Sequence, residues 1–176
     1  WAKTNIGHTE AFDNTTRYTP PSPLDSISVS QAGTDNADSV TQTVTVTGGS
    51  HGDNHTAWDV KGNTGVLADQ YNVILVMPDG GTNSWYWDSP INPKHKYETF
   101  VAGEVVSYID SHYKTIADRS GRAIMGLSMG GHGALYLAFR HQDVFGAAGS
   151  TSGGVDIRPF PKNWGMSKWI GTIDEN

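Results

Sequence analysis

The feature that most constrains the fold is an alternation of short apolar runs with helical patterns between residues 71 and 151. Residues 71–78 form a continuous apolar run that ends at Pro78, which is typical of a strand buried on both faces. Residues 123–127 and 145–150 predict two further strands, the last of them rich in small residues. Strands that alternate with helices predict a parallel α/β sheet with right-handed crossovers.

Two segments between these runs have the periodicity of amphipathic helices. In residues 99–113 the apolar positions fall on one stripe: Val101, Val105, Tyr108 and Ile109. In residues 130–141 the predicted inward positions are Ala134, Leu135, Ala138 and Phe139. Each helix would therefore cover the sheet between two strands.

The first 48 residues have a different composition, with ten Thr, five Ser and a single Leu. Residues 26–30 and 40–47 alternate between apolar and polar side chains, which is typical of half-buried strands, and residues 32–36 resemble a turn. The sequence predicts a β-hairpin or a pair of strands at a sheet edge, with a loosely ordered N-terminal arm as the alternative. It thus divides into residues 1–48 and an α/β domain over residues 49–176.

Composition excludes several classes of protein and site. The chain has no Cys, which excludes disulfides, a thiolate nucleophile and Cys-ligated metal centres. Its net charge of −6 argues against a nucleic-acid-binding surface. The absence of an apolar run of about 18 residues argues against a membrane span. We expect a soluble chain, and the compartment stays open between cytoplasmic and secreted.

The chemistry concentrates in residues 126–130, which read G-x-S-x-G between a predicted strand and a predicted helix. This context predicts a nucleophile elbow, a tight turn that pushes the hydroxyl of Ser128 above the sheet. Gly126 and Gly130 would avoid the steric clashes of so sharp a turn. The backbone N–H of Met129, at the helix N-terminus, would stabilise a tetrahedral oxyanion. A glycine-rich helix start with a capping Ser is the structural alternative.

Around this motif the sequence resembles the esterase D family of α/β-hydrolases. That family includes tributyrin esterases, S-formylglutathione hydrolases, feruloyl and acetyl xylan esterases, and mycolyltransferases. The resemblance is carried by residues 123–135, by the segment M-P-D-G-G followed by N-S-W-Y at residues 77–86, and by residues 145–156. It spans roughly residues 53–165, and it implies an α/β-hydrolase fold with Ser128 as the nucleophile of ester hydrolysis.

The resemblance implies a second oxyanion donor in a loop where the family has a His-Gly pair. Counting back from Trp58 places the pair at residues 49–50, which makes Ser50 and His51 the donor candidates. Counting by identity instead starts the pair at His51 and makes Asp53 the donor. Both registers stay open, because the preceding strand is rich in Thr where the family is apolar.

The second departure from the family concerns the catalytic triad, in which the acid and the histidine follow the serine. After Ser128 the acids are Asp143, Asp156, Asp174 and Glu175. The last histidine is His141, so a triad in the family's order is incomplete. The resemblance therefore implies a fold truncated after the elbow and the following strand.

The other candidate residues have both functional and structural interpretations. Trp85 and Trp87 form either a substrate-pocket wall or core packing under a loop. We expect His132 to line the substrate pocket or to have a capping role, rather than to act as the catalytic base. Trp164 and Trp169 could cover the pocket, whereas His95 and His112 are expected at the surface.

The sequence as a whole predicts a serine carboxylesterase that hydrolyses short acyl esters, including carbohydrate-linked ones, through acyl-Ser128. The alternatives are an inactive fragment or binding module, and an acyltransferase. We expect no cofactor and no metal, since a loop rather than a helix is predicted around His51 and His55. The expected partner is a small-molecule ester, and exposed sheet edges predict a homo-oligomer.

Overall fold

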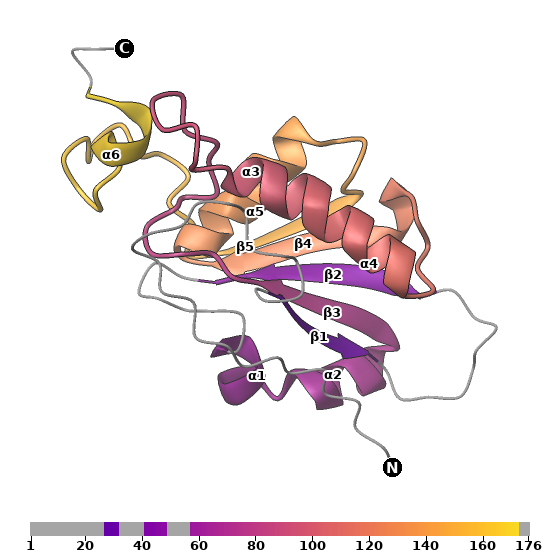
Figure 1. Cartoon of the computed structure of the whole chain (residues 1–176). Helices are drawn as coiled ribbons and strands as arrows, with labels where there is room; N and C mark the ends of the chain where they lie inside the picture. The colour runs from indigo at the N-terminus through magenta and orange to yellow at the C-terminus, as the bar shows by residue number, and fades with distance from the viewer. Residues whose placement is uncertain (1–26, 32–40, 49–56, 173–176) are drawn as a thin grey trace.

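The structure is a computed structural model that describes residues 27–31, 41–48 and 57–172 (Figure 1). Its centre is a five-stranded sheet in the order β1-β3-β2-β4-β5. The strands are β1 (Ile27–Gln31), β2 (Gln42–Thr47), β3 (Val73–Pro78), β4 (Arg122–Leu127) and β5 (Ala147–Thr151). Strands β2 to β5 run parallel to one another, and β1 pairs antiparallel with β3 at one edge. The predicted parallel α/β sheet and its three apolar strands are confirmed.

The predicted hairpin between the two N-terminal strands is wrong. β2 lies in the middle of the sheet, between β3 and β4, and β1 pairs with the far side of β3. Alternation correctly identified both segments as strands, but it carries no information about which strands pair. The predicted arm falls largely on residues 1–26, outside the described residues.

Helices cover the two faces of the sheet (Figure 1). α1 (Ala57–Gly62) and α2 (Thr64–Tyr71) lie on one face. The other face carries α5 (Met129–Arg140) and one continuous helical segment made of α3 (Tyr97–Thr99), the π-helical η2 (Phe100–Val105) and α4 (Val106–His112). A 3-10 turn, η3 (Arg119–Gly121), leads into β4, and α6 (Ser167–Ile170) lies near the C-terminus. This is the layered arrangement expected when a parallel sheet needs cover on both faces.

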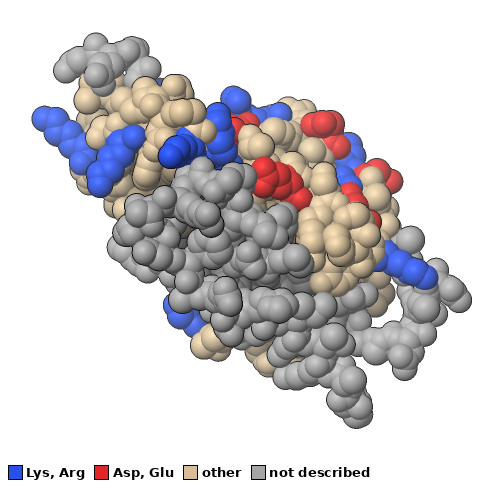
Figure 2. Space-filling model, in the orientation of Figure 1, with Lys and Arg blue, Asp and Glu red and all other residues tan. Residues whose placement is uncertain are grey.

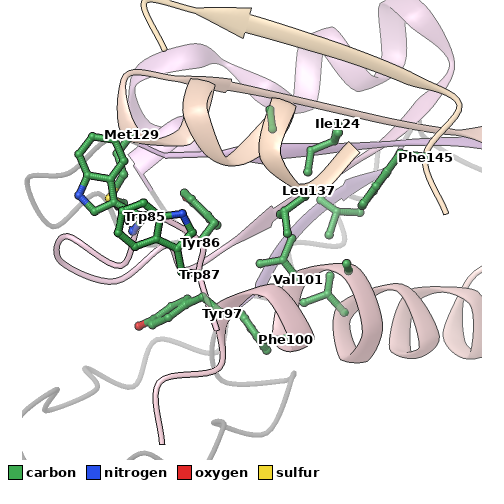
Figure 3. Packing of buried hydrophobic residues seen from close by; sticks show 14 of the residues in the cluster. Trp85, Tyr86, Trp87, Tyr97, Phe100, Val101, Ile124, Met129, Leu137 and Phe145 are labelled. Carbon is green, nitrogen blue, oxygen red and sulfur yellow. Dashed lines mark hydrogen bonds between the residues drawn. The ribbon is translucent and has the colours of Figure 1, made fainter. Parts of the chain in front are cut away.

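The main core lies between the sheet and the α3–α5 layer. Figure 3 shows Ile124 of β4 and Leu137 of α5 packed toward Val101 of η2. The predicted stripe is confirmed at Val101, Val105 and Ile109, each at most 3% exposed. In α5 the prediction is wrong for Phe139, which is 68% exposed. The buried side of the helix includes Leu137, which is fully buried. The two alternatives lie on opposite sides of one helix, and only the position of the sheet decides between them.

One face of the sheet is open at β4 and β5. Val46 of β2 and Met125 of β4 are paired in register, so they lie on the same face. Val46 is buried against the α1–α2 side, whereas Met125 is 40% and Leu127 39% exposed. All residues of β5 except the half-buried Gly149 are exposed. The open face is consistent with the predicted association of copies, which stays a prediction.

The face shown in Figure 2 carries both kinds of charge. Basic side chains lie over the C-terminal segment around α6, and the acidic side chains lie over the α3–α4 layer with basic ones among them. Within the described ranges, no helix is both long and apolar enough to cross a bilayer.

Candidate active site

Ser128 stands where β4 ends and α5 begins, as the elbow prediction requires. Its backbone has φ of 57° and ψ of −119°, in a region that residues other than glycine rarely adopt. The residue is exposed, and its N–H donates to the carbonyl of Thr151 at 2.9 Å. Its own carbonyl accepts from His132 N–H at 3.0 Å, in the first turn of α5. These two hydrogen bonds hold the strained turn and leave the hydroxyl outward.

The two glycines of the motif are required by the end of β2. A Cβ on Gly126 would lie 2.1 Å from Thr47 Oγ1, and one on Gly130 would lie 2.2 Å from the Thr47 carbonyl oxygen. Thr47 is fully buried, and its hydroxyl lies 2.9 Å from the carbonyl oxygen of Met125 and 2.8 Å from that of Gly130. Sequence reasoning missed Thr47. The alternation of residues 40–47 was the available signal, because it places all four Thr of the segment on one face.

The later glycines of α5 also permit close packing. A Cβ on Gly131 would meet the Thr151 carbonyl oxygen at 2.9 Å, so this glycine brings the helix against the end of β5. Gly133 approaches the ring of Tyr86 rather than the sheet, with 2.2 Å from its hypothetical Cβ to Cδ2. The N-terminal turn of α5 is therefore fixed against β2, β5 and the loop after β3.

Met129, the predicted oxyanion donor, is the first residue of α5, and its donor role stays a prediction. Its N–H belongs to the first turn of α5, where backbone donors have no acceptor within the helix. Its side chain is 2% exposed, and the Sδ atom accepts from Trp85 N–H at 3.3 Å. Ser50 and His51 lie outside the described residues, so the second donor stays a prediction.

The loop after β3 brings an aromatic cluster to this end of the sheet, where Figure 3 shows Trp85, Tyr86 and Trp87 beside Met129. Trp85 and Tyr86 have positive φ values of 55° and 60°, which are rare for bulky residues. The strain is held by tertiary contacts: Tyr86 Oη donates to the Gly48 carbonyl at 3.2 Å. Trp85 and Trp87 are 4% and 5% exposed. Both therefore belong to the core, and the pocket-wall role stays a prediction.

His132 is held inside this cluster by both ring nitrogens. Nδ1 donates to the Gly154 carbonyl at 2.8 Å, so Nε2 accepts from Trp87 Nε1–H at 3.1 Å. The two bonds require the neutral tautomer with its proton on Nδ1. Burial lowers the pKa of His132, although the Gly154 carbonyl opposes this. With both nitrogens occupied, His132 orients Trp87 and is not placed to accept a proton from Ser128.

The C-terminal segment packs onto the aromatic loop through two tryptophans. Trp164 lies 5.6 Å from Trp85 between ring centroids and is 44% exposed. Trp169 donates from Nε1 to the Asn83 carbonyl at 2.8 Å and stacks on His95 at 3.8 Å. The expectation of a surface His95 is wrong, since it is 2% exposed. Its polar sequence neighbours suggested exposure, but a ring 74 positions later in the chain covers it.

The hydroxyl of Ser128 has no hydrogen-bonded base among the described histidines. His112 is exposed at the end of α4, and His141 donates to Glu98 Oε1 at 2.8 Å, after the far end of α5. Across the described residues, no group of three metal-binding side chains occurs.

The strain at Ser128 predicts a difference between two variants that both lack the hydroxyl. Glycine adopts positive φ freely, whereas alanine keeps the Cβ that makes this conformation unfavourable. We expect Ser128→Gly to be more stable than Ser128→Ala by about 1–2 kcal/mol. Chemical denaturation of the two variants measures the difference directly. Equal stability would show that the elbow is unstrained.

Comparison with known proteins settles the family. The family model described as "Putative esterase" matches residues 36–174, which is most of the chain. The chain belongs to this esterase family. Esterase Rv1288 of Mycobacterium tuberculosis is 39% identical over 89 residues, covering 49% of this chain and 19% of its own length. The diacylglycerol acyltransferase/mycolyltransferase Ag85A of Mycobacterium leprae is 39% identical over 111 residues, covering 59% and 33%.

A solved ferulic acid esterase has the same arrangement of elements. It is 29% identical with a TM-score of 0.68, over 82% of this chain and 60% of that protein. The α/β-hydrolase fold and the resemblance to the esterase family are thereby confirmed. The chain spans between about a fifth and a third of the two curated relatives and 60% of the solved structure.

Proposed function

We propose that this chain provides the nucleophile of a serine carboxylesterase that hydrolyses short acyl esters through an acyl-Ser128 intermediate. The observation that carries the proposal is the conformation of Ser128, held at a strained φ of 57° with its side chain exposed above the start of α5. Strain at this junction has a chemical use, because it presents the hydroxyl next to unpaired helix N–H groups.

In the proposed reaction, a base removes the proton of the Ser128 hydroxyl while Oγ attacks the ester carbonyl carbon. The oxyanion formed accepts a hydrogen bond from Met129 N–H. Collapse of the tetrahedral intermediate breaks the bond to the alcohol, which leaves with the proton held by the base. Water then attacks the acyl-serine by the same route and releases the acid. The base comes from outside the described residues.

The aromatic cluster supports an ester with a flat or ring-shaped group. The ring of Trp164 is 44% exposed and rests on the buried Trp85, so it offers a supported stacking surface. His132 fixes the orientation of Trp87 from behind. A short acyl chain on Ser128 with its alcohol, including a sugar, toward Trp164 is the arrangement we propose.

The proposal is tested by hydrolysis of p-nitrophenyl butyrate by the chain and by its Ser128→Ala variant. We expect the variant to lose the rate by roughly 10³-fold, since removal of a nucleophile removes the acyl-enzyme route. Labelling with a fluorophosphonate, followed by peptide mass mapping, should locate the adduct on Ser128. Equal rates for the two proteins would overturn the proposal for this chain and favour an inactive fragment.

Acyl transfer is a second candidate, because several relatives have the name diacylglycerol acyltransferase/mycolyltransferase. The chemistry differs only in the last step, in which a sugar or glycerol hydroxyl replaces water as the attacking group. Adding such an acceptor to the assay separates the two candidates. Transesterified product that rises with acceptor concentration favours the transferase, and free acid alone favours the esterase.

A further inference from the structure

The end of β2 makes a contact that the chemistry of a nucleophile elbow does not by itself require. Thr47, the last residue of β2, places its hydroxyl between β4, which precedes the elbow, and α5, which follows it. The single hydroxyl hydrogen is shared between the carbonyl of Met125 in β4, at 2.9 Å, and that of Gly130 in α5, at 2.8 Å. Thr47 therefore bridges the strand before Ser128 and the helix after it.

Thr47 packs tightly against the two glycines of the elbow. The notch that receives it exists because Gly126 and Gly130 have no side chain, and a Cβ on Gly126 would lie 2.1 Å from the hydroxyl oxygen. Thr47 is fully buried, so no water competes for the two carbonyls. Hydrogen bonds depend on direction and apolar packing does not, so the two bonds of the buried hydroxyl fix the orientation of β2 relative to the elbow.

The same strand end leads directly into the loop expected to carry the second oxyanion donor. Gly48 follows Thr47, and its carbonyl accepts from Tyr86 Oη at 3.2 Å. The first donor, Met129 N–H, lies on the elbow side of the bridge. The position of the Met129 N–H relative to the end of β2 depends on how α5 packs against that strand, and the Thr47 hydroxyl is hydrogen-bonded to the Gly130 carbonyl at this contact.

We propose that Thr47 is a positioning residue of the esterase reaction, which holds the nucleophile elbow against the end of β2 and so fixes the positions of Ser128 and of the Met129 N–H. The proposal rests on the proposed function for its kinetic consequence. Thr47 touches no substrate atom. Its contribution is geometric, because a misplacement of about 1 Å in such a site can cost about 10²-fold in rate.

The experiment compares Thr47→Ala with Thr47→Ser, because the two variants differ only in the hydroxyl. Thr45→Ala and Thr45→Ser form the matched control, since Thr45 is 5% exposed on the same face of β2 but is paired in register with Ile124, whereas Thr47 is paired with Gly126. With p-nitrophenyl butyrate, we expect Thr47→Ala to lower kcat about tenfold at unchanged KM. Thr47→Ser should stay within about twofold of the parent, as should both Thr45 variants. Equal kcat values for Thr47→Ala and Thr47→Ser would overturn the proposal.

Hydrogen exchange keeps the test independent of catalysis. The Ser128 amide donates to Thr151 of β5 and the His132 amide donates to the Ser128 carbonyl, so the exchange of both reports opening of the elbow. We expect both to exchange at least about tenfold faster in Thr47→Ala than in Thr47→Ser, even if the parent chain has no esterase activity. Unchanged exchange overturns the bridge itself. A chain without Ser128-dependent hydrolysis but with the exchange difference refutes the proposed function and leaves the bridge supported.

Discussion

Replacement of Gly130 by alanine is expected to lower the free energy of unfolding by about 3 kcal/mol. The new Cβ would lie 2.2 Å from the carbonyl oxygen of Thr47 and 2.5 Å from that of Gly48. Both contacts are with backbone atoms of a central strand and its end, so no side chain can rotate to relieve them. Alanine gains about 1 kcal/mol over glycine in a helix interior, which is too little to offset the clash.

The matched control is Gly103→Ala, in the helical segment on the same face of the sheet. Gly103 is exposed, and a Cβ there meets nothing within 4 Å. We expect that variant to be more stable than the parent by about 0.5 kcal/mol. Urea denaturation of the three proteins measures both changes. If Gly130→Ala is as stable as the parent, the close approach of β2 and α5 is not as the structure has it.

Removal of the carboxylate of Glu98 is the second large effect we expect. Glu98 in α3 is 7% exposed and accepts three hydrogen bonds. The donors are Tyr136 Oη at 2.8 Å, Arg140 Nε at 2.7 Å and His141 Nε2 at 2.8 Å. Glu98 thus ties the α3 end of one helical segment to the C-terminal half of α5. Glu98→Ala should cost about 3 kcal/mol, because it breaks three bonds and leaves the Tyr136 hydroxyl without its acceptor.

The pH dependence of stability distinguishes this carboxylate from others. Burial alone would raise the pKa of Glu98, but the hydrogen bonds from Arg140, Tyr136 and His141 outweigh it and hold the pKa below its ordinary value of 4.5. The folded protein therefore favours the ionised form. Its stabilising contribution is fully present above pH 4.5 and is lost as the pH falls through the lower folded-state value.

Thermal unfolding measured between pH 3 and pH 7, a range of about four units around the ordinary carboxyl value, tests this assignment. We expect the parent to lose more stability on acidification than Glu98→Gln, which keeps the shape without the charge. Asp156→Ala is the control, because Asp156 pairs with Arg158 at an exposed surface and its removal should leave the transition unchanged. Identical pH profiles for the parent and Glu98→Gln would show that Glu98 does not carry the effect.

Local patterns identified the elements that their own residues specify. The apolar run before Pro78 and the stripe at Val101, Val105 and Ile109 predict a buried strand and a helix face, because periodicity reflects which side chains leave water. The G-x-S-x-G pentapeptide predicts the elbow for a similar reason. Its glycines and its position between a strand and a helix are local properties, and the backbone of Ser128 has the expected strain.

The failures have a common cause. Alternation in residues 40–47 identifies a strand but not its neighbours, so β2 was expected in a hairpin and lies at the centre of the sheet. His95 looked like a surface residue, because its burial depends on Trp169, far along the chain. The sequence showed only a strand rich in Thr where the family is apolar, and the partners of Thr47, the carbonyls of Met125 and Gly130, come from β4 and α5.

The sequence by itself determined the strand–elbow–helix unit, the place of the proposed nucleophile in it and the family, since each depends on residues adjacent along the chain. Only the tertiary structure decided which strands pair, that Trp85 and Trp87 are buried, and that both nitrogens of His132 are already bonded. The physical reason is the range of the interactions. Side-chain periodicity and turn sterics act over a few residues, whereas strand pairing and the satisfaction of buried polar groups depend on partners that the fold brings from elsewhere in the chain.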